Sequence, residues 1–305
     1  MTATAAATER TVEVADGVHA YLQEPGGWCV SNAGIVVGDD GAVVIDTLAT
    51  ERRAALLRTT VDELCPASRR IVVNTHHHGD HIFGNHLYGP EATIVAHDGA
   101  RAEMRETGLA LTRLWPDVEW GDVRVTLPTV TFTDRLALTV GGRRIELIGV
   151  APAHTTNDVV AWIPDDRVLF AGDVALAGST PFTLMGSISG SIVAVERLRR
   201  IGPRTIVCGH GPVAGPEVLD ETIEYLRWIQ RLADAGVRKG RTPLEVARDA
   251  DGRFSHLLDP ERIVGNLHRA YAEIEGGPPA RPLDVIGIFG EMVEFNEGRL
   301  PTCLA

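Results

Sequence analysis

A histidine cluster directly after a predicted strand is the feature that most constrains this chain. In RRIVVNTHHHGDH, residues 69–81, an apolar run ends where four histidines and an aspartate begin. His76 and His78 are two residues apart, so in an extended loop their side chains project to one side and can share an ion. Asp80 and His81 follow at the expected start of a short helix, where they can bind a second ion. The alternative is a solvated histidine-rich turn, and the extra His77 is evidence that such runs tolerate more histidines.

Three further residues that suit metal ligation lie just past other predicted strands. His154 follows RIELIGV, Asp173 follows RVLFAG, and His210 follows RTIVCG. In α/β folds, loops at such strand ends converge while the strands hold them rigid. Each residue alone reads as an ordinary loop residue. Together with the cluster they predict one metal site that several loops build.

The distribution of strands and helices predicts an α/β fold of two β-rich halves followed by a helical tail. Strand-like runs fill the N-terminal third, a helix is expected from Thr50 to Leu64, and a second group of strands includes VTFTDRLALTV, residues 130–140. A helix near Val193 to Arg200 follows, and from Glu217 onward three segments have helical apolar faces. Two sheets with helices outside satisfy the burial of such elements. We expect a catalytic domain over residues 1–215 and a helical extension over 216–305 that packs on it.

Charge and composition exclude several classes of partner. The net charge of −12 opposes binding to a phosphate backbone or an anionic membrane surface. No apolar run approaches the roughly 20 residues that span a bilayer, and the N-terminus MTATAAATER lacks the pattern of a secretory signal. The four cysteines have no CxxC pair, which favours reduced thiols. The expectation is a cytoplasmic protein that binds neither nucleic acid nor membrane.

Four motifs, THHHGDH, PAHTTND, LFAGDV and GHGPV, resemble in order and spacing those of the metallo-β-lactamase fold superfamily, over roughly Val36 to Pro212. The resemblance implies an αββα sandwich with two Zn²⁺ per chain in the groove between the sheets. It assigns His76, His78 and His154 to one zinc, Asp80, His81 and His210 to the other, and Asp173 to a bridge between them. Asp46, which ends VVID, is expected to orient the loop or a ligand from outside the ligand set. His77, His86 and His97 match no ligand position and are taken as structural.

The implied chemistry is hydrolysis by a dinuclear zinc site that activates a bridging hydroxide near neutral pH. Asp80 or Asp173 is the expected proton acceptor. Ester, thioester, lactone or amide bonds are the favoured substrates. Secreted zinc β-lactamases of the best-known subclass have a cysteine where this chain has Asp173, which disfavours antibiotic resistance as the native role. Cys208 lies on a predicted strand and is read as a buried apolar residue.

The flanking segments suggest a narrower class of substrate. PGGWCVSNAGIVVG, LWPDVEWGDV, PFTLMGS and RIVGNLHRAYAE are similar to segments of metallo-β-lactamase-fold cyclases of aromatic polyketide pathways. That similarity implies aldol ring closure and thioester hydrolysis on a carrier-bound intermediate. The expected substrate contacts are Trp28, Phe182, Leu184 and Met185.

Other classes of function stay open from the sequence. The alternatives are a generic thioesterase or lactonase, a glyoxalase II-like hydrolase, a mononuclear iron persulfide dioxygenase, and a noncatalytic scaffold that keeps the fold. The substrate would be a small molecule or a carrier-bound acyl group. A homodimer is expected because symmetric association commonly buries the apolar faces of such a helical tail.

Overall fold

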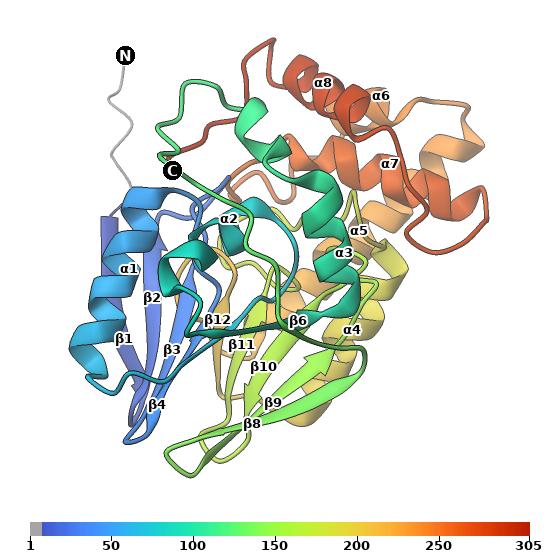
Figure 1. Cartoon of the computed structure of the whole chain (residues 1–305). Coiled ribbons are helices and arrows are strands. Elements are labelled where there is room, and N and C mark those ends of the chain that lie inside the picture. The colour runs from blue at the N-terminus through green and yellow to red at the C-terminus, as the bar shows by residue number, and fades with distance from the viewer. Residues whose placement is uncertain (1–7) are drawn as a thin grey trace.

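The fold is a sandwich of two sheets with helices on both outer faces (Figure 1). The computed structural model describes residues 8–305. The first seven residues, which contributed to the expectation that there is no secretory signal, lie outside that range. Side chains between the sheets form one apolar core, and each outer face has a separate core beneath its helices. The predicted αββα architecture is therefore confirmed.

The first sheet contains seven strands that follow one another in chain order. They are β1 (Thr8–Ala15), β2 (Val18–Glu24), β3 (Ala33–Gly38), β4 (Gly41–Ile45), β5 (Arg70–Val73), β6 (Thr93–His97) and β7 (Val130–Phe132). The pairs from β1 to β4 are antiparallel and those from β4 to β7 are parallel. In β4, Val43 faces the core between the sheets and Val44 faces the outer core. Burial on both faces explains why this strand is a continuous apolar run.

The second sheet has five strands in the order β12-β11-β10-β9-β8. They are β8 (Arg135–Val140), β9 (Arg143–Gly149), β10 (Val159–Ile163), β11 (Val168–Gly172) and β12 (Thr205–Cys208). The run 130–140, expected to be one strand, is interrupted at Thr133 and Asp134. Its first part pairs with β6 and its second part with β9, because the interruption lets the chain pass from one sheet to the other.

The helices cover the sheets and one end of the sandwich (Figure 1). They are α1 (Glu51–Leu64), α2 (Gly79–Ile82), α3 (Asp98–Thr107), α4 (Ile188–Ile201), α5 (Glu217–Arg238), α6 (Pro243–Arg248), α7 (Arg262–Ile274) and α8 (Val285–Phe295), with the 3₁₀ turns η1 (Phe83–Tyr88) and η2 (Ala110–Arg113). Thr50 caps α1 by accepting from the Arg53 N–H. Ser187 caps α4, which begins five residues before the expected Val193 because the Gly/Ser run supplies its first turn.

The C-terminal helices pack over the end of the sandwich where the loops of both sheets meet (Figure 1). One apolar cluster joins α5, α6, α7 and α8 to α3 and to the loop before α4. Within residues 8–305, no helix combines the length and apolar character that crossing a membrane requires.

Candidate metal centre

The candidate ligands all lie at the carboxyl ends of strands, at one edge of the sandwich. Asp46 follows β4, and the cluster from His76 to His81 follows β5. Asp173 directly follows β11, while His154 and His210 lie on the loops that leave β9 and β12. Strand ends of the two sheets thus bring together side chains that are up to 164 residues apart in the sequence, from Asp46 to His210. Sequence reasoning predicted this convergence, and the structure brings these residues into one cluster in which all but His78 and Asp173 are buried.

Two groups of three side chains could each hold an ion, and they are the two triads that the resemblance implied. His76, His78 and His154 form one group, and Asp80, His81 and His210 form the other. The candidate ligand atoms within each group lie within 4.8 Å of one another. This spacing suits ligands that share a single ion.

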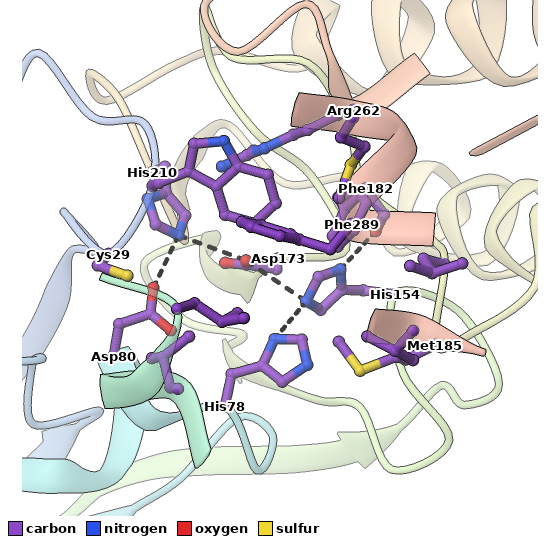
Figure 2. Close-up of a pocket in the computed structure, with 16 residues that line it drawn as sticks. Cys29, His78, Asp80, His154, Asp173, Phe182, Met185, His210, Arg262 and Phe289 are labelled. Carbon is purple, nitrogen blue, oxygen red and sulfur yellow. Dashed lines mark hydrogen bonds and ion pairs between the residues drawn. The ribbon is translucent and has the colours of Figure 1, made fainter. Parts of the chain in front are cut away.

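Asp173 lies between the two triads. Its Oδ2 is 3.5 Å from His154 Nε2 and 3.4 Å from His210 Nε2 (Figure 2). Its Oδ1 is 3.3 Å from His81 Nε2. One carboxylate therefore faces a histidine of the first triad and two of the second. This is the arrangement that a bridging ligand requires. Gly209 makes room for it, because a Cβ there would stand 1.8 Å from Asp173 Oδ1.

Hydrogen bonds fix the tautomers of two candidate ligands. In each, one ring nitrogen faces a backbone carbonyl oxygen, which can only accept a hydrogen bond. His154 Nδ1 donates to the carbonyl oxygen of Phe182, and His210 Nδ1 donates at 3.0 Å to that of Val30. Each proton therefore sits on Nδ1, and each Nε2 keeps a lone pair that is free to bind a metal. His154 Nε2 points toward His78 Nδ1, 3.0 Å away (Figure 2).

Asp46 orients two further histidines, His81 directly and His76 through Thr75, while its own carboxylate faces away from the centre. Its Oδ2 accepts from His81 Nδ1 at 2.8 Å and from the Thr75 hydroxyl at 2.7 Å. Since the Thr75 proton is used there, its oxygen accepts from His76 Nδ1 at 3.0 Å. Asp46 has a positive φ of 61°, a strained conformation that tends to occur at functional sites. The contacts match the orienting role expected for Asp46.

Burial and neighbouring charges set the protonation of the cluster. Burial, reinforced by neighbouring imidazoles, holds the pKa of His76 and His78 well below the usual range, so both are neutral at pH 7. Burial alone would raise the pKa of Asp173, but His210 and His81 hold it well below the usual range. Burial alone would lower the pKa of His81, but the carboxylates of Asp173, Asp80 and Asp46 raise it well above the usual range. A metal cation would replace the His81 proton between these carboxylates.

The donor set fits zinc. His76 Nε2, His81 Nε2 and Asp173 Oδ1 are buried and have no hydrogen-bond partner among residues 8–305. These three residues also form a group whose candidate ligand atoms lie within 4.8 Å of one another. Buried polar atoms without partners are costly unless an ion or water satisfies them. Imidazole nitrogens with carboxylate oxygens are ligands that zinc prefers.

A largely apolar cavity of about 90 Å³ opens directly onto the candidate ligands His78, Asp80, His154, Asp173 and His210 (Figure 2). It contains all four predicted substrate contacts. Its non-ligand lining is Trp28, Cys29, Leu111, Leu114, Phe182, Leu184, Met185, Arg262, Val285, Phe289 and Met292. Trp28 packs edge to face on Phe182 and Phe289. A substrate group that enters this cavity would therefore meet apolar and aromatic side chains beside the metal ligands.

Sequence reasoning missed the contribution of α8 and of Arg262 to this cavity. Val285, Phe289 and Met292 lie on α8, four and three residues apart, so they share one face of the helix. That spacing, together with Asp284 as an N-cap residue, was the sequence pattern that could have predicted an amphipathic helix here. The Arg262 guanidinium stacks over Trp28 at 4.2 Å and pairs with Asp259 at 2.9 Å. Arg262 is only 3% exposed.

The residues that were taken as structural make local contacts and belong to none of the candidate ligand groups. His77 bonds to the Asn157 side chain, His86 Nδ1 donates to the Phe83 carbonyl, and His97 caps α3 by accepting from the Gly99 N–H. Cys208 is buried on β12, as predicted. All four cysteines of the chain lie in the described part and are free thiols.

Comparisons with known proteins agree with this fold. A family profile described as the Metallo-beta-lactamase superfamily matches residues 26–210. A protein named metallo-beta-lactamase type 2, from Bacteroides fragilis, is 24% identical over 221 residues, which cover 69% of this chain and 82% of that protein. A solved metallo-beta-lactamase from Pontibacter korlensis is 21% identical with a TM-score of 0.59, and the match covers 72% of this chain and 99% of that one.

Two relatives with other named activities match over less of their length. A hydroxyacylglutathione hydrolase from Methylococcus capsulatus is 30% identical over 140 residues, 46% of this chain and 47% of that protein. A linear primary-alkylsulfatase from a Pseudomonas species is 24% identical over 256 residues, 70% of this chain and 48% of that protein. The chain thus spans about half the length of these two relatives, which are named for the hydrolysis of different bonds.

Proposed function

Because the chain belongs to the metallo-β-lactamase superfamily, we propose that it is a dinuclear zinc hydrolase that cleaves a thioester or ester with an apolar acyl group. The observation that carries this proposal is the apolar cavity directly against the buried histidine and aspartate cluster. The cluster supplies the hydrolytic centre of the superfamily, and the cavity selects what reaches it.

The first zinc would be held by His76, His78 and His154, and the second by Asp80, His81 and His210, with Asp173 contacting both. Zinc bound there would polarise the substrate carbonyl and make hydroxide available near pH 7. In the balanced reaction, water adds its oxygen to the acyl carbon, the bond to sulfur or oxygen breaks, and the leaving group departs with a proton.

Asp80 is better placed than Asp173 to accept and return that proton. Both oxygens of Asp173 face imidazole nitrogens, and His210 and His81 keep its pKa well below the usual range, so it is a weak base. Asp80 also lines the cavity, and its Oδ2 faces imidazole nitrogens at longer distances, 3.5 Å from His210 Nε2 and 3.7 Å from His81 Nε2. Its backbone carbonyl accepts from the Ser31 hydroxyl at 2.6 Å, which holds the residue in place. We assign proton transfer to the Asp80 carboxylate.

For the substrate itself we propose a carrier-bound aromatic polyketide thioester, which the enzyme would cyclise by aldol condensation and release by hydrolysis. The aromatic lining of Trp28, Phe182 and Phe289 supports a flat acyl group. Among the described residues that line the cavity, Arg262 alone has a permanent positive charge, and Asp259 neutralises it. Apolar contact and shape would therefore dominate recognition.

The second candidate is a glutathione thioester hydrolase, which the match to a hydroxyacylglutathione hydrolase favours. Glutathione carries two carboxylates, and the cavity offers no unpaired arginine or lysine among its described lining residues. This contrast lets one assay separate the two candidates.

The assay supplies thioester mimics of a partly cyclised aromatic polyketide in parallel with an acyl lactone, a glutathione thioester and a β-lactam, each with and without a chelator. We expect chelator-sensitive ring closure or release with the polyketide mimics alone. Efficient turnover of the lactone or the glutathione thioester, with inert polyketide mimics, would refute the polyketide substrate and leave the zinc hydrolase standing. Chelator-insensitive turnover of every compound would refute the metal centre.

A further inference from the structure

The tautomer of His154 depends on a backbone carbonyl that lies in an irregular segment. The Phe182 carbonyl accepts from His154 Nδ1, and residues 181–183 belong to no helix or strand. Without that carbonyl oxygen, the His154 proton could move to Nε2 and remove the lone pair that faces the centre. Something must therefore hold Phe182 in place.

Helix α7 holds this segment through three buried side chains on one face. Arg262 donates to the Thr180 carbonyl at 3.0 Å, Asn266 to that of Pro181 at 2.7 Å, and Arg269 to that of Leu184 at 3.0 Å. Positions 262, 266 and 269 are four and three residues apart, so they share one helix face. Gly265 permits the close approach, because a Cβ there would lie 2.8 Å from the Phe182 ring.

Asn266 contacts the residues on both sides of Phe182. Its Oδ1 accepts from the Thr183 N–H at 2.9 Å and from the Thr183 hydroxyl at 3.0 Å, while its Nδ2 donates to the Pro181 carbonyl and to the Tyr225 hydroxyl. The side chain is 0% exposed, and these four bonds use all of its hydrogen-bonding capacity. A fully satisfied buried network of this kind fixes one conformation.

We propose that Asn266 is a positioning residue for the metal centre: it fixes the Phe182 carbonyl, and through it the metal-binding tautomer of His154. This inference rests on the proposed zinc site. It gives the C-terminal helices a role in the site besides forming the wall of the cavity, since α7 orients a ligand that comes from the second sheet.

The direct test is Asn266→Asp, which keeps the shape of the side chain and its acceptance from Thr183 but removes the amide that donates to the Pro181 carbonyl and the Tyr225 hydroxyl. The matched control is Val264→Ala, because Val264 is equally buried on the same helix and makes none of these bonds. Two quantities are measured on both variants: the affinity for each zinc by competition with a chelator, and the NMR signal and exchange rate of the His154 Nδ1 proton.

We expect Asn266→Asp to weaken one of the two zinc ions by about 10- to 100-fold, the usual effect of losing a contact that orients a ligand. Its His154 Nδ1 proton should shift and exchange faster, while Val264→Ala matches wild type in both measurements even if it is less stable. Wild-type affinity for both ions and an unchanged His154 proton in Asn266→Asp would overturn the proposal.

If Asn266→Asp does not fold, Thr183→Val removes one Asn266 bond and should cause a smaller loss in the same direction, and an unchanged His154 proton would again overturn the inference. If the wild-type protein binds no zinc, the zinc proposal fails by itself. The His154 proton, measured on the protein as purified, then still decides whether Asn266 sets the tautomer.

Discussion

Single residues at the centre differ in which partners they face, and this decides what their replacement does. Asp173→Asn removes the charge that faces His154, His81 and His210 but keeps the size of the side chain. We expect turnover to fall by about 10²-fold or more with the fold intact, because a neutral amide holds two cations together poorly. Steady-state kinetics with circular dichroism measures this. Near wild-type activity would mean that Asp173 is not the bridge.

His77 makes the stability of the protein depend on pH. Burial lowers its pKa to about 4, whereas an unfolded histidine has a pKa near 6.5. Between these values the unfolded chain binds a proton that the folded chain does not. The free energy of unfolding should therefore be highest above about pH 6.5 and fall as the pH drops toward 4, by about 3 kcal/mol.

Urea unfolding of wild type and His77→Gln across this pH range tests the effect. The candidate ligands are the same in both proteins, so any acid-induced loss of metal contributes equally to both. The variant should lose less stability on acidification than wild type. Parallel pH profiles for the two proteins would show that His77 is not the group responsible.

The site residues that were predictable from the sequence are those that lie in one short motif or directly after a recognisable strand. The histidine cluster lies in one short loop after β5, and His154, Asp173 and His210 each follow a recognisable strand. The triads form because those strand ends meet at one edge of the sandwich. Arg262 and Asn266 were not predictable as site residues, because their roles depend on how α7 packs against a segment some 80 residues earlier.

At the scale of elements, sequence reasoning recognised neither α3 nor α8, and α8 forms part of the cavity wall. Phe289→Ala removes a ring that packs against Trp28 and Trp115. We expect KM for aromatic thioesters to rise by roughly tenfold or more, the effect of losing one buried apolar contact. Turnover of a short acyl ester, which does not reach α8, should change little.

Ile286→Ala is the matched control for this prediction, because Ile286 lies on the same helix, is 70% exposed and does not line the cavity. Melting temperatures of both variants separate a change of stability from a change of recognition. An equal rise of KM in the two variants, or none in Phe289→Ala, would remove α8 from substrate binding.

At the scale of the whole molecule, the arrangement of two sheets with helices outside was predictable, but the crossing of residues 130–140 between the sheets was not. A strand break of two residues leaves no strong signal, and only the pairing partners β6 and β9 reveal it. The helical tail was expected to pack on the catalytic domain, and a second chain was expected to bury its remaining apolar surface. In the structure, apolar residues of α5, α6, α7 and α8 pack within the same chain.

The homodimer stays a prediction. It no longer rests on the apolar faces of the helical tail, because these faces pack within the chain. Sedimentation at micromolar concentration tests it, and a dimer is the expected result. A monomer alone would leave packing within the chain as the whole explanation for these apolar faces.

The metal content of the purified protein tests the central claim most directly. Two triads with a carboxylate between them predict close to two zinc ions per chain, measured by elemental analysis against protein concentration. One equivalent of iron with little zinc would contradict the claim and favour a mononuclear dioxygenase. A folded protein with no bound metal would contradict it as well, and would favour a scaffold without catalytic activity.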